Sequence, residues 1–121
     1  MSNIYEQFEA AFANVSAFYI TDADDTRVGR ICIKFPRDST SRLYAYVHVY
    51  GSRMVRGSAT GYGYNKRTAA VGDAAGNLRS NEDDAVTPVH LAMWKAALMK
   101  DSGADWTREL EAAGYRVHQV I

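Results

Sequence analysis

The chain has 121 residues, of which 47% are hydrophobic, and its 14 basic and 14 acidic side chains cancel formally. This length predicts one domain that buries roughly two-thirds of the surface its unfolded chain exposes. The zero net charge excludes a strong overall attraction to nucleic acid or to anionic membranes, so electrostatic binding must come from local patches.

Cys32 is the only cysteine, which excludes an intrachain disulfide and is typical of a reducing cytoplasm. The first residues lack a basic segment leading into an apolar one, and no apolar run approaches the roughly 18 residues of a membrane span. We therefore expect a cytoplasmic protein with no membrane partner.

The N-terminal part of the chain predicts a helix followed by two strands. A first helix of about three turns is indicated by apolar residues at helical spacing. These residues are Ile4, Phe8, Ala11, Phe12 and Val15. Strands are expected over 17–21 and 28–35, joined by a polar turn, because apolar residues in the second segment alternate with Cys32 and Lys34.

Residues 43–50 alternate most strongly. Leu43 and every second residue up to 49 are aliphatic, and three tyrosines and a histidine lie between and after them. Because side chains alternate along a strand, one face belongs in the core and the other carries Tyr44, Tyr46, His48 and Tyr50. A tyrosine packs with its ring and offers a hydroxyl, so this second face is a candidate binding surface.

A turn at Gly51 and Ser52 predicts a hairpin, with residues 53–60 returning as a weakly apolar strand. Its arginines, Arg53 and Arg56, discourage further strand pairing and therefore favour a position at the sheet edge.

A glycine and tyrosine loop at 61–64 leads into an alanine-rich helix that Asn65 is expected to cap. Gly72 inside this helix costs about 1 kcal/mol relative to alanine, which indicates close packing there or a shorter helix.

Residues 85–121 predict a helical extension after an acidic loop. Thr87 and Pro88 form a good start for a helix. Its expected buried stripe is Leu91, Trp94, Ala97 and Leu98. Asp105 predicts a cap for a helix over 106–113 that Gly114 ends, and the alternating tail 115–121 is a candidate last strand.

These elements predict a single α+β domain over residues 1–121. An antiparallel sheet of about four or five strands is expected to pack against an N-terminal helix and the alanine-rich helix. Residues 1–80 would form the α-β-β-β-β-α unit and 85–121 the extension.

Motifs for catalysis or metal binding fail when they are tested against the sequence. His48, His90 and His118 lack zinc-ligand spacing, and the acidic turn from 22 lacks the glycine and the final glutamate of a calcium loop. The run Gly61-x-Gly63-x-x-Lys66 lacks the remaining residues of a phosphate loop. We expect no cofactor, no metal and no catalytic residue, and hence a protein that is not an enzyme.

The middle of the chain is locally basic. No acidic residue occurs from 39 to 72, whereas five cations do: Arg42, Arg53, Arg56, Lys66 and Arg67. The last two stand at the start of a predicted helix, where the helix dipole disfavours cations. They are interpreted either as contacts to an anionic partner or as solubilising charges.

The order of elements over residues 3–78, with Asn65-Lys66-Arg67-Thr68-Ala69-Ala70 opening the last helix, resembles the double-stranded RNA-binding domain. That family's final helix also begins with a basic, alanine-rich run. The resemblance implies phosphate contacts across a minor groove, which a neutral protein supplies only locally. The family's third cation and basic surface are missing, an extra strand is expected, and the extension after Asp83 has no counterpart.

Two segments, 61–70 and Leu110-Glu-Ala-Ala-Gly-Tyr-Arg-Val, are similar to segments of small proteins carried by phages, prophages and plasmids. Some of these proteins, the anti-CRISPR proteins among them, act by occupying a surface of a host defence complex. The resemblance implies a binder whose activity resides in surface shape and charge.

Two functions stay open. The first is a protein-binding module, such as an inhibitor of a host defence ribonucleoprotein, because Tyr and Arg are enriched at the energetic centres of interfaces. The second is direct binding of duplex RNA or single strands, with cations on phosphates and tyrosines stacked on bases. The candidate binding residues are Tyr44, Tyr46, Tyr50, Arg53, Arg56, Tyr62, Tyr64, Asn65, Lys66 and Arg67.

Overall fold

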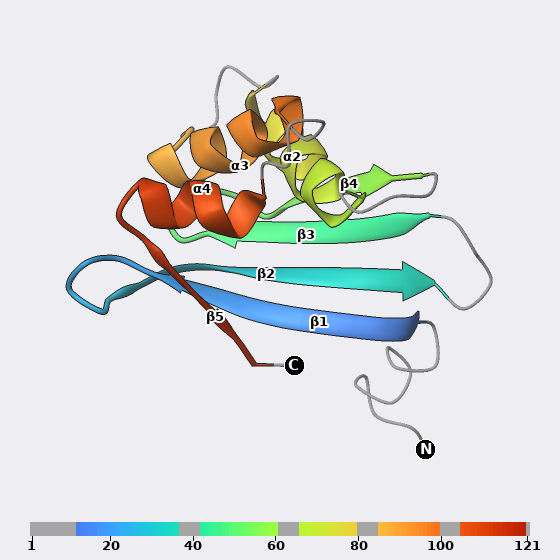
Figure 1. The fold of residues 1–121 in the computed structure, drawn as a ribbon, viewed down its shortest axis with the longest axis horizontal. Coiled ribbons are helices and arrows are strands. Elements are labelled where there is room, and N and C mark those ends of the chain that lie inside the picture. The colour runs from blue at the N-terminus through green and yellow to red at the C-terminus, as the bar shows by residue number, and fades with distance from the viewer. Residues whose placement is uncertain (1–11, 37–41, 61–65, 80–84, 100–104, 121) are drawn as a thin grey trace.

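The computed structural model describes residues 12–36, 42–60, 66–79, 85–99 and 105–120. Within these ranges, five antiparallel strands form one sheet in the order β4-β3-β2-β1-β5. Figure 1 shows the three helices together on one side of this sheet. The predicted α+β class is confirmed.

Strands β1 to β4 follow one another as a meander of antiparallel pairs. They span Phe12–Thr21, Arg27–Pro36, Leu43–Val49 and Val55–Ala59. The predicted hairpin at Gly51 is confirmed, and its φ of 91° is the left-handed conformation that glycine adopts without a Cβ penalty. Strand β4 lies at one edge of the sheet, as its weakly apolar sequence predicted.

The expected tail strand is confirmed as β5, Arg116–Gln119, which pairs with the end of β1 at the other edge of the sheet. It follows a turn at Gly114, whose φ of 94° ends the preceding helix as predicted.

The first predicted helix is wrong where the structure tests it. Phe12 and Val15 lie in β1, and Val15 is paired with Lys34 of β2. The helical spacing was misleading because β1 continues through aromatic and β-branched residues that pair along the whole of β2, and sheet pairing overrides a short periodic pattern. The other members of that pattern, Ile4, Phe8 and Ala11, lie outside the described residues.

Helix α2, Lys66–Arg79, packs on β3 and β4 through small residues. A Cβ on Gly57 would overlap the backbone of Ala74, so the helix lies directly on the strand. A Cβ on Gly72 would likewise overlap the side chain of Ala97 in the next helix. The close packing predicted at Gly72 is therefore confirmed.

Helices α3, Pro88–Leu98, and α4, Trp106–Ala112, have the predicted caps. The side chain of Thr87 accepts a hydrogen bond from the amide of His90, and Asp105 accepts one from the amide of Thr107. In return, the amide of Thr87 donates to Nδ1 of His90, which completes a capping box.

The predicted buried stripe of α3 is wrong. Leu91 and Leu98 are 46% and 65% exposed, and Trp94 and Ala97 are only partly buried. The helix instead buries the opposite stripe, which is Val89, His90, Ala92, Met93 and Ala96. Nearly every residue of α3 is apolar, so the sequence gives two possible stripes. The burial of the capping histidine shows which one faces the core.

Candidate functional site

The side of the sheet away from the helices is where the tyrosines lie. Directly paired residues share a side, and the pairs run from Arg56 through Tyr46 to Cys32, and from His48 through Arg30 to Tyr19 and His118. No described helix lies on this side (Figure 1). We call it the open face, and its principal residues are Tyr19, Arg30, Cys32, Lys34, Tyr44, Tyr46, His48, Arg56 and His118.

Each tyrosine of the open face that lies within a strand has a cation above its ring. The guanidinium of Arg27 lies 4.0 Å from the ring centre of Tyr19 and donates a hydrogen bond to its hydroxyl.

The other two pairs lie towards β4. The ammonium of Lys34 lies 4.4 Å from the ring centre of Tyr46, and the guanidinium of Arg56 lies 5.8 Å from that of Tyr44. The face of an aromatic ring is electronegative and attracts a cation at these distances. The open face is therefore an array of paired flat rings and positive charges.

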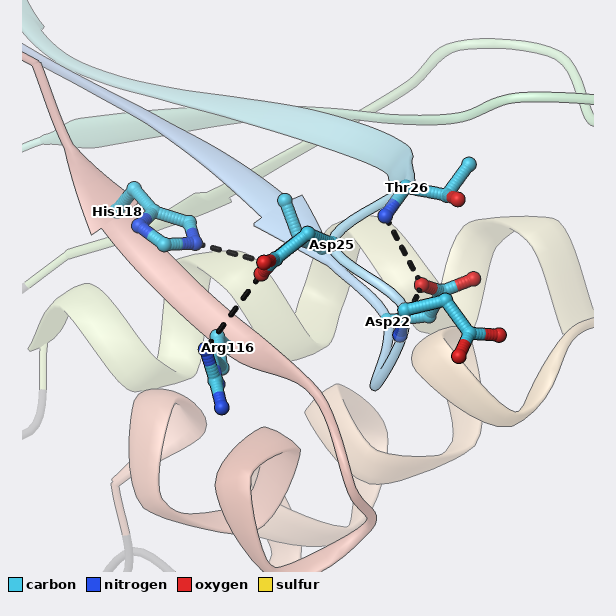
Figure 2. A network of polar contacts seen from close by, with 7 residues as sticks. Asp22, Asp25, Thr26, Arg116 and His118 are labelled. Carbon is cyan, nitrogen blue, oxygen red and sulfur yellow. Dashed lines mark hydrogen bonds and ion pairs between the residues drawn. The ribbon is translucent and has the colours of Figure 1, made fainter.

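None of the five strands contains an Asp or Glu, although they contain four arginines and a lysine. The nearest acidic residues along the chain are three aspartates in the β1–β2 turn. Asp22 is used there to cap the turn through the amide of Thr26, and Asp25 forms an ion pair with Arg116 at 3.5 Å (Figure 2). Acidic and basic side chains balance over the whole chain, but the five strands carry only basic ones.

A hollow of about 210 Å³ lies at the centre of the open face, between β2 and β3. Its described lining is Arg30, Cys32, Lys34, Tyr46, His48 and Met54. Lys34 is only 6% exposed, and burial lowers the pKa of its ammonium. Cys32 opposes this shift, while the like charge of Arg30 lowers the pKa further.

The structure brings together some of the predicted site residues. Tyr44, Tyr46 and Arg56 lie on the open face. Tyr50 and Arg53 lie in the turn that follows β3, with the ring of Tyr50 5.4 Å from that of His48. Tyr44, Tyr46, Arg56 and Tyr50 are thus linked through pairing and ring contacts, and Arg53 follows them in the turn.

The basic start of α2 does not belong to this region. Arg67 donates a hydrogen bond to Ser16, which neighbours the buried Phe18 on the helix-covered side of β1. Lys66 precedes it at the first position of the helix. The sequence order placed both residues close to the tyrosines, but the sheet separates them. The remaining predicted residues, Tyr62, Tyr64 and Asn65, lie outside the described residues.

Sequence reasoning missed most of the open face. Tyr19, Arg30, Lys34 and His118 were not candidate residues, and neither was Arg27 beside Tyr19, although the alternation in β2 already separated Lys34 from the core residues. Antiparallel pairing of β2 with β3 would have put Lys34 beside Tyr44 and Arg30 beside His48.

His90 is fully buried on the core-facing side of α3, and burial lowers its pKa. In the described part of the chain no group of three or more His, Cys, Asp or Glu side chains could hold a metal ion. No described helix is long and apolar enough to cross a bilayer.

No family model matches the chain, and neither the curated proteins nor the solved structures gave a match. The resemblances to double-stranded RNA-binding domains and to anti-CRISPR proteins therefore stay predictions.

Proposed function

We propose that the protein binds single-stranded nucleic acid on the open face of its sheet. The supporting observation is the array of three tyrosines, each with a cation above its ring, on strands that carry no carboxylate. Proteins that bind single strands combine cations along the backbone with flat groups on which bases stack, and each stacked base contributes about 1 to 3 kcal/mol. Both parts occur here on one surface.

The position of the surface favours single strands over duplexes. The resemblance to the double-stranded RNA-binding domain predicts that the basic start of the last helix would contact the phosphates of a duplex. Here Arg67 of that segment is engaged with Ser16, on the other side of the sheet. A broad sheet face with tyrosines on two strands, β1 and β3, suits bases that are unstacked from a partner strand.

The test is fluorescence anisotropy with labelled single-stranded DNA and RNA of about 12 nucleotides and with the matching duplexes. At about 50 mM salt we expect a micromolar or tighter Kd for single strands, which weakens as salt increases because counterions are released. The absence of single-strand binding under these conditions would remove the proposal.

Matched arginine variants localise the binding. Arg56→Gln removes a charge from the open face and should weaken binding about tenfold at low salt. Arg108→Gln removes the same charge from α4, on the helix-covered side, and should change the Kd less than twofold, roughly. Equal losses in both variants would mean that binding follows net charge and is not located on the open face.

A protein partner is the second candidate function, and the β3–β4 turn favours it. Tyr50 and Met54 are 47% and 56% exposed, and Arg53 lies between them. Exposed aromatic, methionine and arginine side chains are typical of the centres of interfaces. Inhibition of a host nucleic-acid-handling complex would be one function of such a protein-binding surface, and it remains a prediction. The absence of enzymatic activity also remains a prediction.

Affinity capture from a host lysate separates this candidate from the first. A specific protein partner should be captured by the wild type and by Arg108→Gln, and it should be lost with Met54→Asp. Capture that survives nuclease treatment would indicate protein contact. If nuclease treatment abolishes the capture, the contact is made through nucleic acid, which supports the first candidate function.

A further inference from the structure

A row of rings crosses the open face from β5 to β3. Strand pairing places His118 beside Tyr19, and Tyr19 beside Arg30. Arg30 is in turn paired with His48, and the ring centre of Tyr50 lies 5.4 Å from that of His48. Because directly paired residues share a side of the sheet, these side chains form one line across the strands. We call it the ring row, and it has two rings at each end and Arg30 between them.

The two ends of the ring row are preformed platforms. At the β5 end, a hydrogen bond of 2.8 Å joins Nε2 of His118 and Oγ1 of Thr21, and the ring centres of His118 and Tyr19 are 6.0 Å apart. At the β3 end, the ring of Tyr50 meets that of His48 edge to face, and Tyr50 is 47% exposed. Rings that neighbours already hold in place lose little conformational freedom when a base stacks on them.

Arg30 supplies a positive charge between the platforms. Its side chain is exposed, and it stands on β2, the central strand of the sheet. A guanidinium donates paired N–H groups that match two oxygens of a phosphate. The ring row therefore has the order ring, charge, ring, which matches the order base, phosphate, base in a single strand.

The distance between the platforms decides which strands fit. Tyr19 and His48 stand on β1 and β3, and neighbouring strands are about 4.8 Å apart, so the platforms are separated by roughly 10 Å. Bases that stack on one another are only about 3.4 Å apart. A continuous stack also covers the faces of its inner bases. Two neighbouring bases can therefore occupy both platforms only after they have separated from each other.

We propose that the ring row selects pyrimidine-rich single strands, because their bases separate more easily than purines. One base stacks on the platform of His118 and Tyr19, the next stacks on the platform of His48 and Tyr50, and the phosphate between them lies on Arg30. Sequence preferences of this kind come from the strength of stacking and the flexibility of the backbone. The inference rests on the proposed function and deepens it, because it names the class of strand that is bound.

The test compares oligothymidylate with oligoadenylate, each of about 12 nucleotides, by fluorescence anisotropy at about 50 mM salt. We expect oligothymidylate to bind about tenfold more tightly, since adenines must first be unstacked. His118→Gln removes one ring and keeps a polar partner for Thr21, and Tyr50→Leu removes an exposed ring at the other end. In each variant the ratio of the two Kd values should fall below about twofold, because a single platform does not require neighbouring bases to separate. Urea midpoints close to the wild-type value show that both variants are folded.

Arg56→Gln is the matched control, because it removes a charge of the open face outside the ring row. It should weaken both oligonucleotides alike and leave the ratio at the wild-type value, since contacts to phosphates carry no sequence information. If the wild type binds both oligonucleotides equally well, the ring row is overturned and single-strand binding stands. A preference that persists in either His118→Gln or Tyr50→Leu also overturns it. If neither oligonucleotide binds, the proposed function fails and the inference fails with it.

Discussion

The two sides of the sheet differ although they alternate residue by residue along the same strands. On the helix-covered side, Ile31 and Val47 are fully buried, whereas on the open face the neighbouring Cys32 and Tyr46 are only partly buried. Aliphatic side chains supply the burial that holds the domain together. The rings and charges of the open face contribute little to this buried apolar surface.

The comparison teaches that stability and binding are separable in this fold. A substitution on the helix-covered side removes buried apolar surface, whereas one at Tyr44, Tyr46 or His48 of the open face removes a group that is only partly buried. We therefore expect the largest losses of stability on one side and the largest losses of affinity on the other.

The sharpest test is a pair of substitutions on adjoining strands. Ile31→Ala should reduce the free energy of unfolding by about 4 kcal/mol, because it leaves a cavity in the core. Tyr44→Ala on the open face should cost less than about 1 kcal/mol in stability yet weaken single-strand binding about tenfold. Urea denaturation and anisotropy measure the two effects. Equal stability losses would break the distinction between the two sides.

Close packing of α2 on β4 gives the next largest effect. Gly57→Ala should cost about 3 kcal/mol, since the added methyl would overlap the backbone of Ala74, and backbone cannot rotate away. Ser58→Ala, one residue further along the strand, is the control and should change the free energy of unfolding by less than about 0.5 kcal/mol. If Gly57→Ala left the free energy of unfolding unchanged, the helix would be able to shift away from the strand at little cost.

The buried histidine predicts a pH dependence of the helix-covered side. Burial lowers the folded-state pKa of His90 below its ordinary 6.5, so the unfolded chain takes up the proton first. The stabilising contribution is complete above that value and is lost as pH falls from 6.5 toward the lower folded pKa, at no more than about 1.4 kcal/mol per pH unit.

His90→Gln is the matched variant, because glutamine keeps an acceptor for the amide of Thr87 and does not titrate. Urea midpoints between about pH 7 and pH 5 should decline less in the variant than in the wild type. Parallel curves would mean that other groups set the pH dependence.

The smallest effect is expected at the exposed ion pair beside the β1–β2 turn. The side chains of Arg116 and Asp25 are 66% and 74% exposed, so Asp25→Asn should change stability by less than about 0.5 kcal/mol. Asparagine also tolerates the φ of 62° at this position, which leaves the ion pair as the main variable. A larger loss that persists at high salt would point to a role in holding the turn.

Much of the fold could be predicted because several segments carry one unambiguous pattern. Strict alternation fixed both faces of β3, and cap residues such as Thr87, Asp105 and Gly114 placed helix ends by local chemistry alone. The start of β1 and the buried stripe of α3 could not be predicted. In both segments more than one periodic pattern was available, and only long-range pairing or packing chose between them.

The candidate site could be predicted only in its local part. Tyr44, Tyr46 and Arg56 belong to one hairpin, so sequence neighbours became spatial neighbours. Tyr19 and His118 join the face only through pairing between distant segments. Arg67 was predicted to lie with the tyrosines because it is close to them along the chain. That prediction was wrong, since a short separation along the chain does not determine which side of a sheet a helix covers.

The packing of α2 against β4 also limits how copies of the chain can associate. The side chain of Asn77 donates to the carbonyl of Arg56, and Asp73 accepts from the amide of Ser58, so two backbone groups of this edge strand are already occupied by the helix. A strand from another molecule that paired with β4 would have to break both hydrogen bonds, which makes this edge less open to further pairing.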